Sequence, residues 1–212
     1  MSRNPINRVR VKICGLTRSE DVQAAVQAGT DALGFVLYEP SPRYVSAERA
    51  GELLAETPAF VTTVGLFVDA GEDVVRASLE KAPFDLLQFH GDESPEYCRQ
   101  FARPYMKAIR VRSQQDIEDA VAKYPDAAAL LLDAYVENLP GGTGQAFDWR
   151  LIPEMEIPWV LAGGLKPENV ADAVNQVKPY AVDISGGVEQ AKGIKDKEKI
   201  QKFISEIRNV EI

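Results

Sequence analysis

Short runs of apolar and β-branched residues recur along the chain, separated by polar stretches with helical periodicity. Eight such runs can be read, at residues 9–13, 32–37, 62–67, 86–90, 105–110, 128–133, 159–162 and 181–184. The runs are continuous rather than alternating in hydrophobicity, which is typical of parallel strands buried on both faces. Their starts lie 19 to 31 residues apart, enough chain for one strand, one helix and their loops.

Segments with helical periodicity fill the intervals between the runs. They predict helices over residues 19–28, 46–56, 72–81, 94–102, 113–123, 167–176 and 196–208, and a shorter helix near Asp148. Pro95 and Pro167 stand where a first helical turn tolerates proline, and Gly29 suits the position just past a helix. Strand and helix therefore alternate along the chain.

This alternation predicts an α/β fold: one domain over residues 1–212, built as a (β/α)8 TIM barrel. A doubly wound open sheet is the alternative, but its glycine-rich phosphate loop normally follows the first strand. Here the doublets Gly163-Gly164 and Gly186-Gly187 come late, at the ends of the last two runs. Because glycine lets backbone N–H groups approach a ligand closely, these turns predict a phosphate site after strands 7 and 8.

Composition narrows the choice of partners. Among the 212 residues, 32 are acidic and 24 basic, giving a formal net charge of −8. A nucleic-acid partner favours a basic surface and a membrane span needs ~20 apolar residues, so we expect neither. The N-terminus lacks the apolar segment of a signal peptide and the two cysteines lie far apart, which favours a reduced, cytoplasmic protein. A monomer and a homodimer both remain open.

Polar residues at strand ends carry the candidate chemistry, because these ends face the active site of a barrel. The set is Cys14, Arg43, His90, Asp133, Asp183 and Ser185. A single histidine excludes a multi-histidine zinc site within one chain, and no nicotinamide fingerprint is present. We therefore expect no metal and no cofactor.

Cys14 and Asp133 are the candidates for acid–base chemistry. Cys14 is either a small buried group or a general base at the barrel mouth. A free thiol has a pKa of roughly 8.5, so a base would need a cationic neighbour or a helix N-terminus. Asp133 ends an apolar strand, where a carboxylate is costly unless it is used or paired. It would donate a proton or order the following loop.

Three further side chains are candidates for ligand binding. Arg43, stiffened by two preceding prolines, could hold a carboxylate or phosphate by two hydrogen bonds, or lie on the surface. His90 enters the mouth or bonds to its loop, and Asp183 binds a ligand or forms an ion pair. The glycine-rich residues 141–144 either close over a ligand or form a plain loop.

Together these motifs resemble those of the phosphoribosylanthranilate isomerase family. The resemblance runs in order from about Val9 to the C-terminal helix. It is carried by Lys12-Ile13-Cys14-Gly15-Leu16-Thr17, Ser41-Pro42-Arg43-Tyr44-Val45, Gln88-Phe89-His90-Gly91-Asp92, Gly141-Gly142-Thr143-Gly144, Leu161-Ala162-Gly163-Gly164-Leu165 and Val182-Asp183-Ile184-Ser185-Gly186-Gly187-Val188-Glu189. The first two segments are its most specific part.

The resemblance implies a (β/α)8 enzyme of tryptophan biosynthesis that uses no cofactor or metal. It would convert N-(5-phosphoribosyl)anthranilate to 1-(2-carboxyphenylamino)-1-deoxyribulose 5-phosphate by an Amadori rearrangement. By motif, Cys14 would be the general base, Asp133 the general acid and Arg43 the ligand of the anthranilate carboxylate. Asp183 would lie near the amine or the sugar, and His90 would line the pocket. The implied phosphate ligands are Gly163, Gly164, Ser185 and Gly186.

Gly186 departs from the family pattern, which commonly has serine there. The backbone N–H remains, so phosphate binding should persist but weaken. On the residues alone, two other functions remain open. Another phosphosugar isomerase or a lyase would use a group such as Lys12 in place of Cys14. A phosphate-ligand sensor or scaffold would bind its ligand without turnover.

Overall fold

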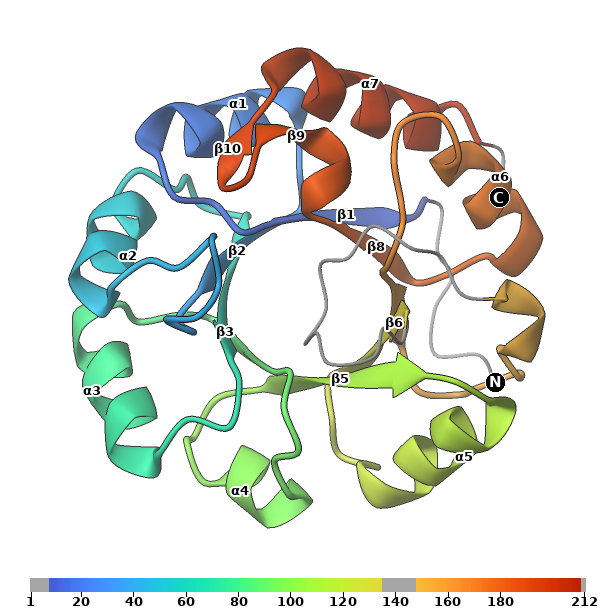
Figure 1. Cartoon of the computed structure of the whole chain (residues 1–212), viewed down its shortest axis with the longest axis horizontal. Helices are drawn as coiled ribbons and strands as arrows, with labels where there is room; N and C mark the ends of the chain where they lie inside the picture. The colour runs from blue at the N-terminus through green and yellow to red at the C-terminus, as the bar shows by residue number, and fades with distance from the viewer. Residues whose placement is uncertain (1–7, 135–147, 211–212) are drawn as a thin grey trace.

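Eight parallel strands form a closed barrel and pair in chain order, as a computed structural model of residues 8–134 and 148–210 shows (Figure 1). They are β1 (Arg10–Cys14), β2 (Ala32–Val36), β3 (Thr62–Phe67), β4 (Leu86–Phe89), β5 (Tyr105–Val111), β6 (Ala129–Ala134), β7 (Trp159–Leu161) and β8 (Ala181–Ile184). Pairing of β1 with β8 closes the barrel and places Lys12 level with Asp183. The predicted (β/α)8 barrel is confirmed.

Helices cover the outside of the barrel (Figure 1). They are α1 (Ser19–Ala28), α2 (Ala47–Leu54), α3 (Glu72–Lys81), α4 (Pro95–Arg99), α5 (Gln114–Lys123), α6 (Val170–Val177) and α7 (Lys197–Arg208), with 3-10 turns η1 (Trp149–Leu151) and η2 (Gly186–Val188). Ser46, Ser94 and Ser113 cap their helices by accepting a backbone N–H of the first turn. These caps explain why the predicted starts of α2, α4 and α5 are close to the observed ones.

Two elements differ from the prediction. The helix expected from Pro167 begins only at Val170, because Asn169 uses its side chain on the preceding turn: Oδ1 accepts from Lys166 N, and Nδ2 donates to Gly164 O. The chain after β8 forms an unpredicted hairpin, β9 (Glu189–Ala191) with β10 (Ile194–Lys195). Its mostly polar residues give no apolar run from which a strand could be read.

Alternate residues of each strand face two different cores. On β6, Leu130 and Leu132 pack among the side chains between barrel and helices, whereas Leu131 belongs to a smaller cluster with Ala108 and Val160. This smaller cluster fills the barrel interior, as in other (β/α)8 folds. Asp133 follows Leu131 by two positions, so strand alternation directs it to the inner side at the mouth.

Among the described residues, none of the helices combines the length and apolar character needed to cross a membrane.

Candidate active site

A pocket of about 310 Å³ opens where the barrel strands end. Every residue predicted for the site lines it: Cys14, Arg43, His90, Asp133, Gly163, Gly164, Asp183, Ser185 and Gly186. The chain thus brings together side chains from both ends of its sequence. Residues 141–144, the predicted closing loop, lie outside the described part of the chain.

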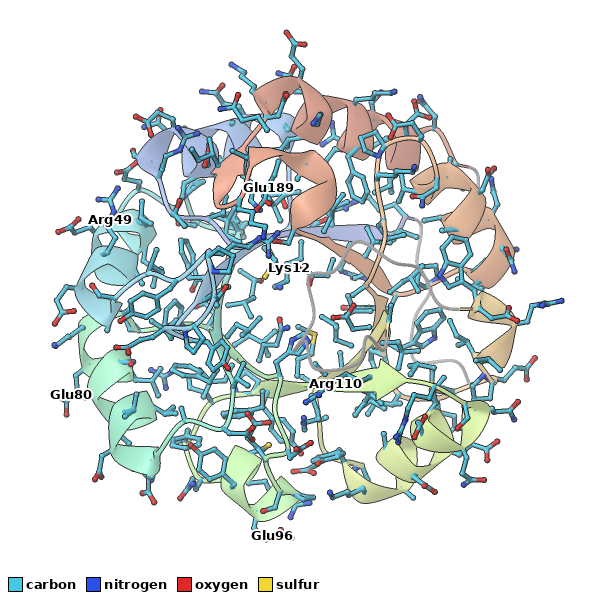
Figure 2. All side chains as sticks on the ribbon, viewed as in Figure 1. Lys12, Arg49, Glu80, Glu96, Arg110 and Glu189 are labelled. Carbon is cyan, nitrogen blue, oxygen red and sulfur yellow. The ribbon has the colours of Figure 1, made fainter. Side chains whose placement is uncertain are left out.

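On one side of the pocket, Cys14 lies beside a buried ion pair. Lys12 Nζ donates to Asp183 Oδ1 at 2.8 Å, and their side chains are only 5% and 10% exposed. In Figure 2, Lys12 lies on the inner side of β1, toward the middle of the barrel. Both Lys12 and Cys14 crowd Gly34: a Cβ there would be 3.0 Å from Lys12 Nζ and 2.9 Å from Cys14 Sγ. Glycine on β2 therefore makes room for the ammonium group and the thiol together.

Opposing electrostatic effects act on this thiol. Burial raises the pKa of Cys14 above its ordinary value, while the charges of Lys12 and Lys195 act in the opposite direction. Burial also disfavours the charge on Lys12, but Asp183 and Cys14 outweigh it and raise the Lys12 pKa. The cationic neighbour that a thiolate base requires is thus present and charged.

Across the pocket, Asp133 at the end of β6 lies beside His90. Asp133 Oδ1 accepts from the Ala134 N–H at 2.9 Å, and Oδ2 lies 3.3 Å from His90 Nε2. His90 Nδ1 is 2.9 Å from Gln88 Nε2. With that amide nitrogen as donor, Nδ1 accepts and a neutral ring carries its proton on Nε2, facing Asp133. The carboxylate thus accepts one backbone N–H and lies beside the imidazole of His90.

Two buried polar atoms on this wall remain without a hydrogen bond among the described residues, His90 Nε2 and Gln88 Oε1. Both side chains line the pocket. A buried polar atom left unpaired costs free energy, so each is suited to contact polar groups of a ligand. Gln88 was missed as a site residue because it lies within the strand rather than at its end.

Arg43 reaches the pocket from the loop after β2 and is 13% exposed. Its Nε and Nη2 donate to the two carboxylate oxygens of Glu189 at 2.7 and 2.9 Å. The side chain crosses over Gly15, whose φ is +75° and where a Cβ would stand 2.6 Å from Arg43 Cδ. Only glycine fits this combination of left-handed backbone and close contact.

Beside Arg43, the two glycine turns pack against each other. A Cβ on Gly187 would stand 2.1 Å from the carbonyl oxygen of Leu165. Gly163 and Gly164 have φ values of +77° and +67°, and a Cβ on Gly163 would be 2.6 Å from Ala134 N. The turns after β7 and β8 therefore form one compact wall of backbone.

Comparison with known proteins identifies the fold's relatives. The family model described as N-(5'-phosphoribosyl)anthranilate (PRA) isomerase matches residues 11–206. The chain belongs to this family. It is 56% identical over 205 residues to an N-(5'-phosphoribosyl)anthranilate isomerase of Pseudomonas fluorescens, covering 96% of this chain and 98% of that one. A Thiobacillus denitrificans enzyme of the same name is 57% identical over 202 residues, with 94% and 98% covered.

Solved structures of PRA isomerases share the barrel. The Thermotoga maritima enzyme superposes with a TM-score of 0.84 at 37% identity, covering 94% of this chain and 98% of that one. A second PRA isomerase structure, in complex with reduced 1-(o-carboxyphenylamino)-1-deoxyribulose 5-phosphate, gives a TM-score of 0.81 at 37% identity, with 94% and 98% covered. The resemblance inferred from the motifs is confirmed at the level of the PRA isomerase family.

Proposed function

We propose that this pocket isomerises N-(5'-phosphoribosyl)anthranilate, a step of tryptophan biosynthesis, with Cys14 as general base and Asp133 as general acid. The observation that carries this proposal is their placement on opposite walls of one pocket, Cys14 at the end of β1 and Asp133 on β6. A substrate lying across the mouth meets one group on each side. Family membership supplies the reaction; the residue roles are our assignment.

The first step opens the sugar ring. Asp133 donates its proton to the ring oxygen, the bond from C1′ to that oxygen breaks, and the nitrogen lone pair forms a Schiff base at C1′. The positive charge on the protonated Schiff base makes the proton on C2′ acidic. The Cys14 thiolate removes that proton and the electron pair forms the C1′–C2′ double bond. Tautomerisation moves a proton from the C2′ hydroxyl to C1′ and yields the ketose. Proton exchange with solvent then returns Cys14 to the thiolate and Asp133 to the acid. Substrate and product are isomers, so the scheme needs no oxidant or reductant and uses no cofactor or metal.

Lys12 makes the base role feasible for a buried thiol. A thiolate needs a nearby positive charge, and Lys12 supplies one while Asp183 holds the ammonium group in place. We assign Asp183 to this pair and to contact with the substrate amine or sugar. His90 lines the pocket beside Asp133, with Nε2 3.3 Å from Asp133 Oδ2.

We assign the substrate's two anionic ends to different groups of the pocket. The phosphate would lie against Gly163, Gly164, Ser185 and Gly186, which line the pocket and where glycine lets a ligand approach the backbone closely. The anthranilate carboxylate would meet Arg43, whose planar guanidinium suits a carboxylate. We further propose that residues 1–212 form one domain and that the chain acts in the cytoplasm, as a monomer or homodimer, on a small phosphosugar without a nucleic acid.

Turnover of N-(5'-phosphoribosyl)anthranilate, followed by loss of anthranilate fluorescence, tests these roles. Cys14→Ser and Asp133→Asn should each lower kcat by about 10²–10⁴-fold, the usual contribution of one positioned proton transfer. Their thermal unfolding should match the parent protein, which separates chemistry from folding. Arg43→Ala should chiefly raise KM. Near-normal kcat in either of the first two variants would remove that residue from the mechanism.

A further inference from the structure

Glu189 does not line the pocket, but it binds Arg43, which does. A guanidinium carries five N–H groups, and Glu189 occupies one on Nε and one on Nη2. Among the described residues, Arg43 Nη1 has no hydrogen-bond partner. The clamp therefore fixes one edge of the guanidinium and leaves the other edge free for a ligand carboxylate.

A second basic side chain, Lys195, also binds the Glu189 carboxylate. Lys195 Nζ lies 2.9 Å from Glu189 Oε1, and its side chain is 0% exposed. The same Nζ donates to the carbonyl oxygen of Ser185 at 3.1 Å, and the Gly193 N–H donates to Glu189 Oε1 at 3.3 Å. The carboxylate is shared between two basic side chains rather than bound by Arg43 alone.

Gly186 lies next to this cluster of side chains. A Cβ at Gly186 would stand 3.2 Å from Arg43 Nη2 and 3.9 Å from Glu189 Oε2. The glycine that replaces the family's common serine thus borders the clamped guanidinium directly. In Figure 2, Glu189 lies by β9, beyond β1 from the barrel centre.

We propose that Glu189 is a positioning residue for substrate specificity: with Lys195 it presents the free edge of Arg43 to a carboxylate on the aromatic ring of the substrate. This inference rests on the proposed function, because it assumes that Arg43 binds the anthranilate carboxylate. Glu189 acts only through Arg43 and has no part in the proton transfers. Its contribution is therefore confined to substrates that carry the carboxylate.

The variant Glu189→Gln tests this, since glutamine keeps the shape and removes the charge. We expect KM for N-(5'-phosphoribosyl)anthranilate to rise about tenfold, as a charge-assisted fork becomes a neutral contact, with kcat within about twofold. For the counterpart made from aniline, which lacks the carboxylate, we expect the same KM in variant and parent. A residue that only stabilises the fold would move both substrates alike.

A double-mutant cycle separates this inference from the proposed function. If Arg43→Ala raises KM and Glu189→Gln adds nothing in its background, Glu189 acts through Arg43. If Arg43→Ala raises KM but Glu189→Gln alone does not, the positioning role is wrong and the proposed function stands. If Arg43→Ala leaves KM unchanged, the assumed carboxylate contact fails, and this inference fails with it.

Two further variants complete the experiment, one as a control and one as a substitute for Glu189→Gln. Asp126→Asn removes a fork of the same geometry, since Arg99 Nε and Nη2 bond to Asp126 at 2.6 and 2.9 Å on the exposed surface, and should leave KM unchanged. If Glu189→Gln does not fold, Glu189→Asp keeps the charge but is too short to span both cations. It should raise KM for the carboxylate-bearing substrate alone, and an equal rise for the aniline counterpart would overturn the proposal.

Discussion

Gly163 joins the turn after β7 to the proposed proton donor, and Gly163→Ala tests how precisely Asp133 must be placed. The alanine Cβ would stand 2.6 Å from Ala134 N and 2.7 Å from Asp133 Oδ1. Neither neighbour can rotate away, because Asp133 Oδ1 already accepts the Ala134 N–H at 2.9 Å. The substitution therefore pushes on the end of β6 itself.

The geometry sets the size of the effect. The 2.6 Å contact falls about 0.8 Å short of the 3.4 Å at which ordinary contact begins, so β6 and the β7 turn must separate by that amount. A misplacement near 1 Å at a catalytic group can cost about 10²-fold, so we expect kcat to fall by roughly 10–100-fold. The left-handed φ adds about 2 kcal/mol of strain, or a Tm lower by about 4–8 °C.

Steady-state kinetics and thermal unfolding of the same preparation measure both effects. Gly71→Ala is the matched control, because a Cβ there meets nothing within 4 Å and φ is −66°. It should leave kcat unchanged. If Gly163→Ala kept kcat within twofold of the parent while lowering Tm, the position of Asp133 would not depend on this contact, and the reasoning would be refuted.

Two further predictions concern pH. Burial raises the pKa of Cys14 and only its thiolate acts as a base, so kcat/KM should climb from neutral to alkaline pH; a flat profile would exclude the thiolate. Burial of Asp31 is outweighed by hydrogen bonds from Arg8 and the Val11 N–H, which hold the pKa of that carboxyl below its ordinary value. Its stabilising effect is present above its unfolded-state pKa of 3.8 and is lost as pH falls through the lower folded-state value. Asp31→Asn should therefore destabilise the protein at neutral pH and match the parent in strong acid, as urea unfolding would show.

The sequence predicts the pocket residues well because their placement follows from topology. Cys14 and Asp133 each lie at the end of a parallel strand, and a barrel brings all such ends to one face. A reader of the sequence needs only the strand ends and the closure of the sheet. The turns at Gly163 and Gly186 could be located for the same reason.

Pairings between distant side chains could not be predicted in this way. Glu189 lies 146 positions from Arg43, and nothing local to either residue indicates the other. Lys195 lies on a hairpin without an apolar pattern, so its burial is visible only once β10 is placed. Glu189 ends a motif that carries the family resemblance, which was the one signal available for it.

The close approach of Gly187 to the Leu165 carbonyl shows that some pocket residues tolerate substitution less than others. In the turns that carry the proposed phosphate wall, neighbouring backbone stands too close to Gly163 and Gly187 to admit a side chain, so substitution at these two positions disturbs the fold. The wall around Arg43 is made of side chains, which can be exchanged singly. Selection for new substrates should therefore retain the phosphate and collect its changes at the other end. Such an enzyme would evolve to accept substrates with other aromatic or aliphatic amines while it still required a phosphorylated sugar.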